Sequence, residues 1–164
     1  MKRRLACVAL LLIGLSGCGF RLRGPVNMAF TSVAIEAPPH SGLVNPLRRQ
    51  LAAATNTQLS DLPSQAALRV EILSENRDKE VLSVNAQGRV REVTLSLRVR
   101  ARALNAQNKE ILPSTEFIQR RDLSFNESIV LAKEAEENLL YQEMQTEIIA
   151  LLVQRIAALP ATVP

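Results

Sequence analysis

The chain contains few of the residue types that stack on bases, bind metals or perform catalysis. It has no tryptophan, one tyrosine, four phenylalanines, one histidine and two cysteines in 164 residues. Because proteins that stack nucleic-acid bases need exposed aromatic rings, this scarcity argues against a nucleic-acid partner. One histidine and two cysteines are too few for a Cys₂His₂ or Cys₄ zinc site. A glycine-rich phosphate loop and a G-x-S-x-G nucleophile motif are also missing. We therefore expect no enzymatic activity, no metal and no cofactor other than covalent lipid.

The main apolar run lies at the N-terminus and has the form of an export signal. Lys2-Arg3-Arg4 precedes eleven largely apolar residues, 5–15. That run is too short for a membrane-spanning helix, which needs roughly 20 residues, but it suits a signal peptide. It ends in Leu15-Ser16-Gly17-Cys18, which is similar to a bacterial lipobox. We therefore predict that residues 1–17 are removed and that Cys18 is the lipid-attachment residue. The alternative is an ordinary secretory signal followed by a chance cysteine.

Cleavage at this point changes what the composition implies. The remaining 147 residues lose three of the 20 lysines and arginines, so 17 basic residues face 16 acidic ones. Cys7 leaves with the signal and Cys18 carries lipid, so we expect no disulfide within the mature chain. More than one acyl chain gives stable membrane anchoring. Gly19 stands where lipoprotein sorting rules would require aspartate for retention in the inner membrane. We therefore expect an outer-membrane protein whose lipidated tether covers residues 18–29.

Hydropathy patterning in the mature chain predicts the order strand, helix, three strands, helix. The predicted strands are residues 31–37, 68–84, 93–103 and 110–123, the second with a polar interruption at 74–80, and the helices are residues 45–56 and about 127–159. Because the strand alternation and the helical stripes each offer one apolar face, they predict two packed layers. The fold class is therefore α+β, with two helices on one face of a roughly four-stranded mixed sheet, β-α-β-β-β-α. We assign residues 30–160 to this domain and 161–164 to a short tail.

Local signals set the expected ends of these elements. Asn45-Pro46 predicts an N-cap followed by proline at the first helical position. Gly88 is suited to a positive φ in the turn before the third strand. Pro113 cannot donate to a ladder, so its strand should carry a bulge or lie at a sheet edge. Ser124-Phe125-Asn126-Glu127 fits the S-x-x-E capping box of the last helix.

The last helix has an apolar stripe every four residues. The stripe consists of Leu140, Met144, Ile148, Leu152 and Ile156, and Leu151 and Leu159 are expected to widen it. Thirty residues in a helix give about 45 Å. Because this exceeds what a small sheet needs, we expect one end of the helix to project or to break.

The third strand shows the clearest alternation in the sequence. Its apolar side chains fall on one face over eleven residues, and Arg98, Arg100 and Arg102 fall on the other. These three residues, the arginine ladder, stand about 6.6 Å apart. Their guanidinium groups can pair with carboxylates on neighbouring strands, or they can bind phosphates or carboxylates of a partner. The sequence leaves both alternatives open, and we take the ladder as a candidate partner interface.

Two further arginines follow the Gly88 turn. Arg89 and Arg91 share strand parity with Val93 and therefore continue the apolar line of the third strand. Cations at the rim of an apolar face suit an amphiphile with an anionic head and acyl tails. By contrast, His40 follows two prolines and is expected to be an ordinary loop histidine.

Several short motifs occur in order along the mature chain. They are Cys18-Gly19-Phe20-Arg21-Leu22-Arg23-Gly24, Leu47-Arg48-Arg49-Gln50-Leu51, the Gly88 turn leading to Glu92, Arg121-Asp122-Leu123-Ser124, Leu131-Ala132-Lys133-Glu134, and residues 141–144. In this order and spacing the chain resembles the lipopolysaccharide-assembly lipoprotein family LptE. The resemblance implies two helices on a four-stranded sheet and a location in the outer membrane with the β-barrel LptD. It also implies a plug in the barrel lumen that assists barrel folding, binds lipopolysaccharide and helps to insert it into the outer leaflet.

The resemblance also implies basic residues that contact lipopolysaccharide. Lys133 matches the lysine of the family's Leu-Ala-Lys motif. The other basic contact falls near Ala86 here and does not carry over, and replacement by Arg89 or Arg91 is a hypothesis. Val93 stands where the family often has tyrosine. The ligand-binding prediction is therefore Lys133, Arg89 and Arg91. An adaptor lipoprotein of another envelope-assembly complex remains the alternative function.

Overall fold

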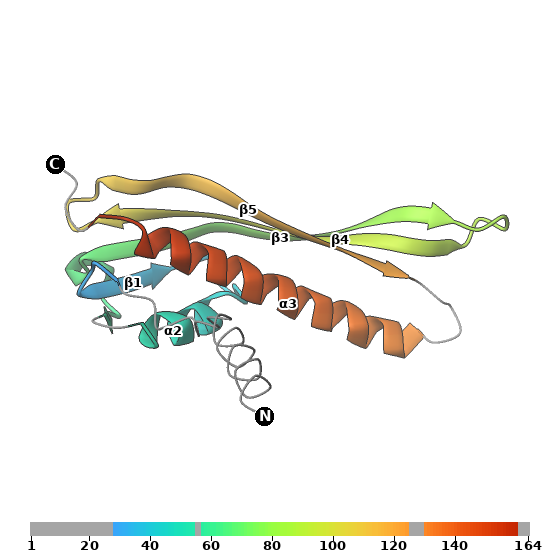
Figure 1. The fold of residues 1–164 in the computed structure, drawn as a ribbon, viewed down its shortest axis with the longest axis horizontal. Helices are drawn as coiled ribbons and strands as arrows, with labels where there is room; N and C mark the ends of the chain where they lie inside the picture. Colours follow the sequence, from blue (N-terminus) through green and yellow to red (C-terminus); the bar gives the residue numbers. More distant parts are fainter. Residues whose placement is uncertain (1–27, 55–56, 125–129, 161–164) are drawn as a thin grey trace, which may run out of the picture.

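Five strands and two α-helices make up the residues that the computed structural model describes, 28–54, 57–124 and 130–160 (Figure 1). The predicted signal peptide, Cys18, most of the tether, the tail and most of the capping box lie outside these ranges. In chain order the elements are β1 Ser32–Glu36, α2 Val44–Ala52, β2 Gln58–Leu59, the 3-10 helix η2 Pro63–Gln65, β3 Leu68–Val84, β4 Val90–Asn105, β5 Glu110–Ser124 and α3 Val130–Ala157.

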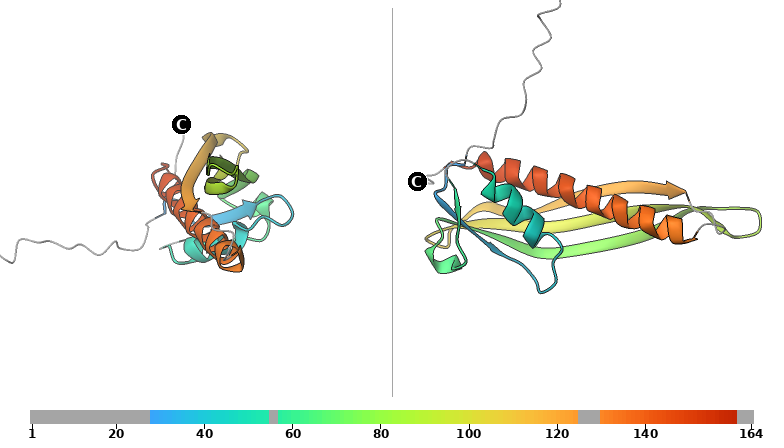
Figure 2. Two further views of the ribbon diagram at one scale, coloured as in Figure 1. Left: turned by 90° about the vertical axis from the view of Figure 1, so that its right-hand side faces the viewer. Right: turned by 90° about the horizontal axis from the view of Figure 1, so that it is seen from below.

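The α+β class is confirmed, although the sheet has five strands instead of roughly four. The strand order is β2-β1-β3-β4-β5. β1 pairs in parallel with β2 and β3, whereas β3, β4 and β5 are antiparallel. The additional strand, β2, has only two residues, which is too short for alternation to reveal it. Both helices cover the same face of this mixed sheet, as the view from below shows (Figure 2).

The turns and bulges follow the local sequence signals. Gly88 has φ +77° in the turn between β3 and β4, a conformation that glycine adopts without steric cost. Pro113 lies in β5, which is an edge strand. It also lies beside a register shift, because Ala101 pairs with Thr115 while Ala103 pairs with Leu112. The expectation of a bulge or an edge for Pro113 is therefore met on both counts.

The second long strand extends to Val84 as predicted, and the polar segment 74–80 does not break it. β3 runs without a break over 17 residues. A bulge at Leu73 separates the Ile72–Ala101 pair from the Ser74–Arg100 pair. After this bulge the odd-numbered β3 residues take up the helix-facing side. The strand thus remains paired with β4 while polar side chains replace apolar ones beneath α3.

Both helices differ from the sequence expectation at particular residues. α2 starts one residue before the expected cap, with Leu43 as its N-cap, so Asn45 lies inside the helix. Pro46 is still tolerated, because backbone N–H groups of the first turn have no intrahelical acceptor. In α3 the stripe from Met144 to Ile156 is buried as predicted, but Leu151 is exposed and Ile149 and Val153 fill its place.

The long helix α3 neither projects nor breaks. Its 28 residues span about 42 Å and lie along the sheet (Figure 1). β3, β4 and β5 have 15 to 17 residues each, which is about 50 Å of strand. The sheet is therefore long enough to cover the whole helix, and the expectation failed because it assumed a small sheet.

The core lies between the helices and the apolar face of β4. The β4 side chains that the alternation predicted to be buried are at most 2% exposed: Val93, Leu95, Leu97, Val99, Ala101 and Ala103. Ser96 and Leu104 of β4, which the alternation did not include, are also buried, at 6% exposed each. Burial of a valine or leucine side chain contributes about 1.5–3 kcal/mol, which fixes this face inward. The alternate residues of β4, including the arginine ladder, must then lie on the face that carries no helix.

Candidate functional site

The arginine ladder pairs with carboxylates on both neighbouring strands. Arg98 lies 3.4 Å from Asp78 of β3, and Arg100 lies 3.5 Å from Glu116 of β5. Arg102 Nε donates to Glu71 Oε2 of β3 at 2.6 Å. Of the two alternatives that the sequence left open, pairing between neighbouring strands is therefore present in the structure.

Glu71 is the most enclosed carboxylate of the ladder. Its side chain is 13% exposed and accepts from Arg69 Nε at 2.9 Å as well as from Arg102. Burial alone would raise the pKa of Glu71, but the hydrogen bonds and charges of Arg102 and Arg69 outweigh it and hold the pKa below its usual value. The Glu71 end of the ladder is therefore an ionised, doubly paired cluster, whereas the other two pairs are more open to solvent.

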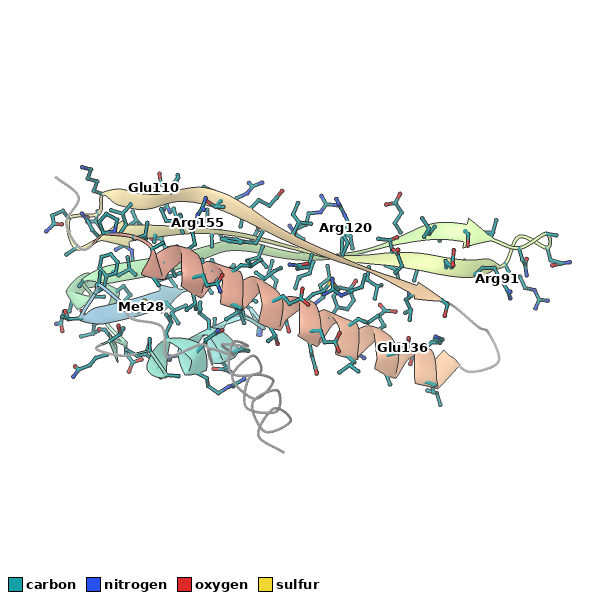
Figure 3. All side chains as sticks on the ribbon, in the orientation of Figure 1. Met28, Arg91, Glu110, Arg120, Glu136 and Arg155 are labelled. Carbon is teal, nitrogen blue, oxygen red and sulfur yellow. The ribbon has the colours of Figure 1, made fainter. Side chains whose placement is uncertain are left out.

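The helix-free face of the sheet presents charges of both signs. Besides the ladder and its partners, this face carries Asp122, whose Oδ1 accepts from Thr94 Oγ1 at 2.7 Å. Arg120 of β5 is another cation on this face (Figure 3). Ile118 is the exposed large apolar residue among them. A partner that meets this face contacts a flat polar surface with its own internal pairs, rather than a row of unpaired cations.

The predicted ligand residues gather at one end of the molecule. Arg91 lies near the hairpin that joins β3 and β4, and Glu136 lies near the start of α3, at the same end of the molecule (Figure 3). Sheet register connects them, because Glu92 stands opposite Ser124 and the Ser124 hydroxyl lies 3.4 Å from Lys133 Nζ. We call this region, residues 81–92, Ser124, Leu131 and Lys133, the distal end. The structure therefore brings Lys133, Arg89 and Arg91 to the same end of the sheet.

These cations differ in accessibility. Lys133 is only 12% exposed at its side chain, and its ammonium group donates to Glu136 at 2.7 Å. The Arg89 backbone closes the turn through Asn85, and Arg89 and Arg91 are both exposed. The two arginine side chains are therefore exposed to a ligand anion, whereas the Lys133 ammonium is enclosed and already donates to a carboxylate.

The distal end also carries exposed apolar side chains. Val81, Leu82 and Val84 of β3 are each more than half exposed, and Leu131 at the start of α3 is 82% exposed. Cations and apolar side chains therefore occur together at this end, which is the combination that an anionic amphiphile requires. Sequence reasoning identified the cations and extended the strand to Val84, but it did not single out these apolar residues as part of a ligand surface.

A polar seam between β3 and α3 was not predicted. Lys79 Nζ donates to Glu137 at 2.6 Å, the Arg77 guanidinium lies 4.9 Å from the Tyr141 ring centroid, and Gln145 donates to Glu75 at 3.0 Å. Two strand residues advance about 6.6 Å and four helical residues about 6 Å, so the two spacings match. The sequence signal that could have predicted this seam is the spacing of its polar residues, which stand two apart in the strand and four apart in the helix.

Tyr141 closes the seam against the backbone of β3. Its hydroxyl donates to the Asp78 carbonyl at 2.9 Å. Burial, together with the negative charges of Glu137 and Asp78, raises the pKa of Tyr141, and the positive charge of Arg77 only partly opposes this. The neutral phenol therefore acts as a hydrogen-bond donor that fixes the helix to the strand edge.

Glu75 ties the loop between β1 and α2 to the rest of the fold. Its carboxylate accepts from the Ser41 hydroxyl at 2.8 Å, from the Gly42 N–H at 3.1 Å and from Gln145. A Cβ on Gly42 would lie 2.7 Å from Gln145 Nε2, so glycine permits this close approach. His40 lies in the same loop, as expected for a loop histidine.

A metal-binding cluster is not found in the described ranges. No group of three or more histidine, cysteine, aspartate or glutamate side chains there could hold a metal ion. None of the helices in those ranges is both long and apolar enough to cross a bilayer.

Comparison with known sequences identifies one family. The model of the family described as LptE, lipopolysaccharide-assembly, matches residues 30–156. The LPS-assembly lipoprotein LptE of Pectobacterium atrosepticum is 27% identical over 161 residues, which cover 95% of this chain and 86% of that protein. The match therefore extends over nearly the whole domain.

Solved structures agree with the fold. Lipoprotein B from Nitrosomonas europaea, described as uncharacterized, superposes with a TM-score of 0.74 at 34% identity, covering 85% of this chain and 91% of that one. Rare lipoprotein B from Shewanella oneidensis has a TM-score of 0.67 at 20% identity, covering 77% and 94% of the two chains, and supports the fold alone.

Proposed function

The chain belongs to the LptE family of lipopolysaccharide-assembly lipoproteins, and from that premise we propose a non-catalytic role in an outer-membrane translocon. In this proposal the protein plugs the lumen of an LptD-type β-barrel, assists its assembly, binds lipopolysaccharide and helps to insert it into the outer leaflet. The observation that carries the proposal is the family match across residues 30–156. The relatives that share the match are named as LPS-assembly lipoproteins, which names a part in assembly and no reaction.

The helix-free sheet face supports the plug role. The interior of an outer-membrane barrel is polar, so a plug needs a polar surface that remains stable against it. The ladder pairs provide such a surface, because most of its charges already have a partner within the domain. We accordingly keep Arg98, Arg100 and Arg102 as the proposed partner interface, with their carboxylates included.

The length of the domain supports a position across the membrane. The described chain begins at Met28, which lies at the end opposite Arg91 (Figure 3). β3 alone has 17 residues, or about 56 Å, against about 40–45 Å for a bilayer with its headgroups. With Cys18 lipidated and held in the inner leaflet, the distal end would reach the outer leaflet through a barrel lumen.

The distal end supports lipopolysaccharide binding. Arg89, Arg91 and Lys133 can bind phosphates, and guanidinium forks suit phosphate oxygens. The exposed apolar residues beside them can cover acyl chains. Because Glu136 partly neutralises Lys133, its contribution to binding should be smaller than its charge alone suggests.

The ligand part of this proposal is tested by charge reversal in the mature domain. We expect Lys133→Glu and the double Arg89→Glu/Arg91→Glu variant to weaken lipopolysaccharide binding about tenfold. The double variant should keep its thermal midpoint, because both arginines are exposed, whereas Lys133→Glu faces Glu136 and should lower the midpoint. Arg155→Glu is the matched control for Lys133→Glu, because it makes the same charge change on an exposed residue at the other end of α3. If all three changes weaken binding equally, the effect is one of net charge and the proposed ligand site is wrong.

The alternative of an adaptor lipoprotein makes a different prediction in the same assay. An adaptor for another envelope complex would bind lipopolysaccharide no better than a simple anionic detergent. A preference for lipopolysaccharide at equal charge supports the translocon role.

A further inference from the structure

The edge of β3 becomes open where β1 leaves it. β1 pairs with β3 only from Val33–Leu68 to Glu36–Glu71. Pro38 and Pro39 follow, and proline cannot continue the ladder as a donor. Within the described ranges, no other strand pairs with β3 on this side. β3 nevertheless continues to Val84, so its backbone keeps N–H and C=O groups along an edge that no strand pairs with.

A groove lies directly along the first part of this open edge. Its volume is about 710 Å³, and two segments line it, Pro38–Gly42 on one side and Leu73–Arg77 on the other. Glu75 holds the Pro38–Gly42 wall in place through Ser41 and Gly42. The wall is therefore fixed to the sheet, and the groove between wall and edge is a built feature of the fold.

The orientation of the β3 backbone can be assigned from Tyr141. Its hydroxyl reaches the Asp78 carbonyl at 2.9 Å, so that carbonyl points away from β4. In an antiparallel pair, residues alternate between facing the partner strand and facing away. Because no register shift intervenes between Ser74 and Asp78, Asn76 and Ser74 also direct their N–H and C=O groups to the open edge.

These features define what the groove can hold. Alternating N–H and C=O groups at a two-residue repeat are matched by the backbone of another extended polypeptide, the mode known as strand addition. The wall limits the space beyond the edge, so the occupant must be a single strand such as a loop or tail. The edge of a formed sheet, including β3 of a second copy, would bring its own wall into collision.

We propose that an extended segment of about five residues from the barrel partner adds as a strand to β3 beside Leu73–Arg77, in the place that β1 leaves at Glu36. The identity of the partner rests on the proposed function. Leu73 is exposed in the groove and suits an apolar side chain. Arg77, whose guanidinium stacks on Tyr141, suits a carboxylate. The segment is therefore an extended loop or tail that combines apolar and acidic residues.

The test uses the full-length lipoprotein purified with its barrel. A photoreactive residue at Leu73 is combined with either Asn76→Pro or Asn76→Thr. Proline removes the outward N–H but leaves the β3–β4 ladder, as edge proline generally does, whereas threonine keeps the donor. We expect the threonine background to cross-link one barrel segment and the proline background to lower that yield about tenfold, because a donor is lost and the ring blocks the edge.

Each further outcome separates this inference from the proposed function. Equal yields in the two backgrounds, or a cross-link to a second copy, overturn strand addition while the barrel still co-purifies. Absence of any co-purifying barrel overturns the proposed function and the inference together. Hydrogen exchange on the unmodified complex avoids the variants altogether. The Asn76 amide should exchange more slowly in the complex than in the free protein, and unchanged exchange contradicts strand addition.

Discussion

The ion pairs of the arginine ladder should contribute unequally to the free energy of unfolding. Replacing the arginines one at a time tests this. Arg102→Ala removes a 2.6 Å hydrogen bond from Glu71, a carboxylate that is 13% exposed. Arg100→Ala removes a 3.5 Å pair between side chains that are 54% and 43% exposed. A hydrogen bond to a charged group contributes about 1.5–3 kcal/mol, and an exposed pair about 0–1 kcal/mol.

Exposure sets the expected magnitudes within these ranges. Arg102 is itself 39% exposed, and Glu71 keeps Arg69 as a second partner. We therefore discount the Arg102→Ala cost to about 1–2 kcal/mol and expect about 0.5 kcal/mol or less for Arg100→Ala. Urea denaturation of the mature domain measures both. Because the two changes remove the same side-chain stem, the difference between them reports the carboxylate partner.

The stability that Glu71 contributes should depend on pH. The pKa of Glu71 is lowered in the folded protein, so its contribution is fully present above the unfolded carboxyl value of about 4.3. That contribution is lost as the pH falls through the lower, folded value. The extra cost of Arg102→Ala should therefore shrink in acid, and it should also shrink in a Glu71→Gln background, where the amide oxygen still accepts but carries no charge. Equal costs for Arg100→Ala and Arg102→Ala at neutral pH would refute the reasoning.

Three further perturbations test the seam and the loop. Tyr141→Phe should cost about 1 kcal/mol at pH 8, through the lost bond to Asp78. Because the Tyr141 pKa is raised in the fold, unmodified protein should lose stability relative to this variant above about pH 10. Gly42→Ala should displace the Gln145 amide and lower stability by about 1 kcal/mol in urea denaturation, and no loss would contradict the close approach. Lys79→Met should cost less than about 1 kcal/mol and lose its effect in high salt, since the Lys79–Glu137 pair is partly exposed.

The sequence alone predicted the structure correctly where one face of a strand or helix is buried. β4 alternates over its full predicted length because its helix-facing side chains form the core, and the fold class and the position of Pro113 followed from the same kind of pattern. Membership in the LptE family was also reached from short motifs in order, and the family match over residues 30–156 confirmed it.

The features that failed depend on register and on distant partners. Bulges in β3 at Leu73 and near Leu82 shift strand parity, and no local signal in the sequence marks them. The seam was missed because Arg77 and Tyr141 lie 64 positions apart and neither segment by itself indicates the contact between them. Leu151 was misplaced because a four-residue repeat drifts around a helix that has about 3.6 residues per turn.

In the proposed function, this lipoprotein sits inside an outer-membrane barrel. The most direct measurement is to solubilise outer membranes in mild detergent, purify the lipoprotein and identify its stoichiometric partner. If the protein is a barrel plug, that partner is a heat-modifiable β-barrel at equal stoichiometry. A purified lipoprotein with no barrel, or with only a soluble partner, would contradict the claim and leave the ladder face and the distal end to another envelope complex.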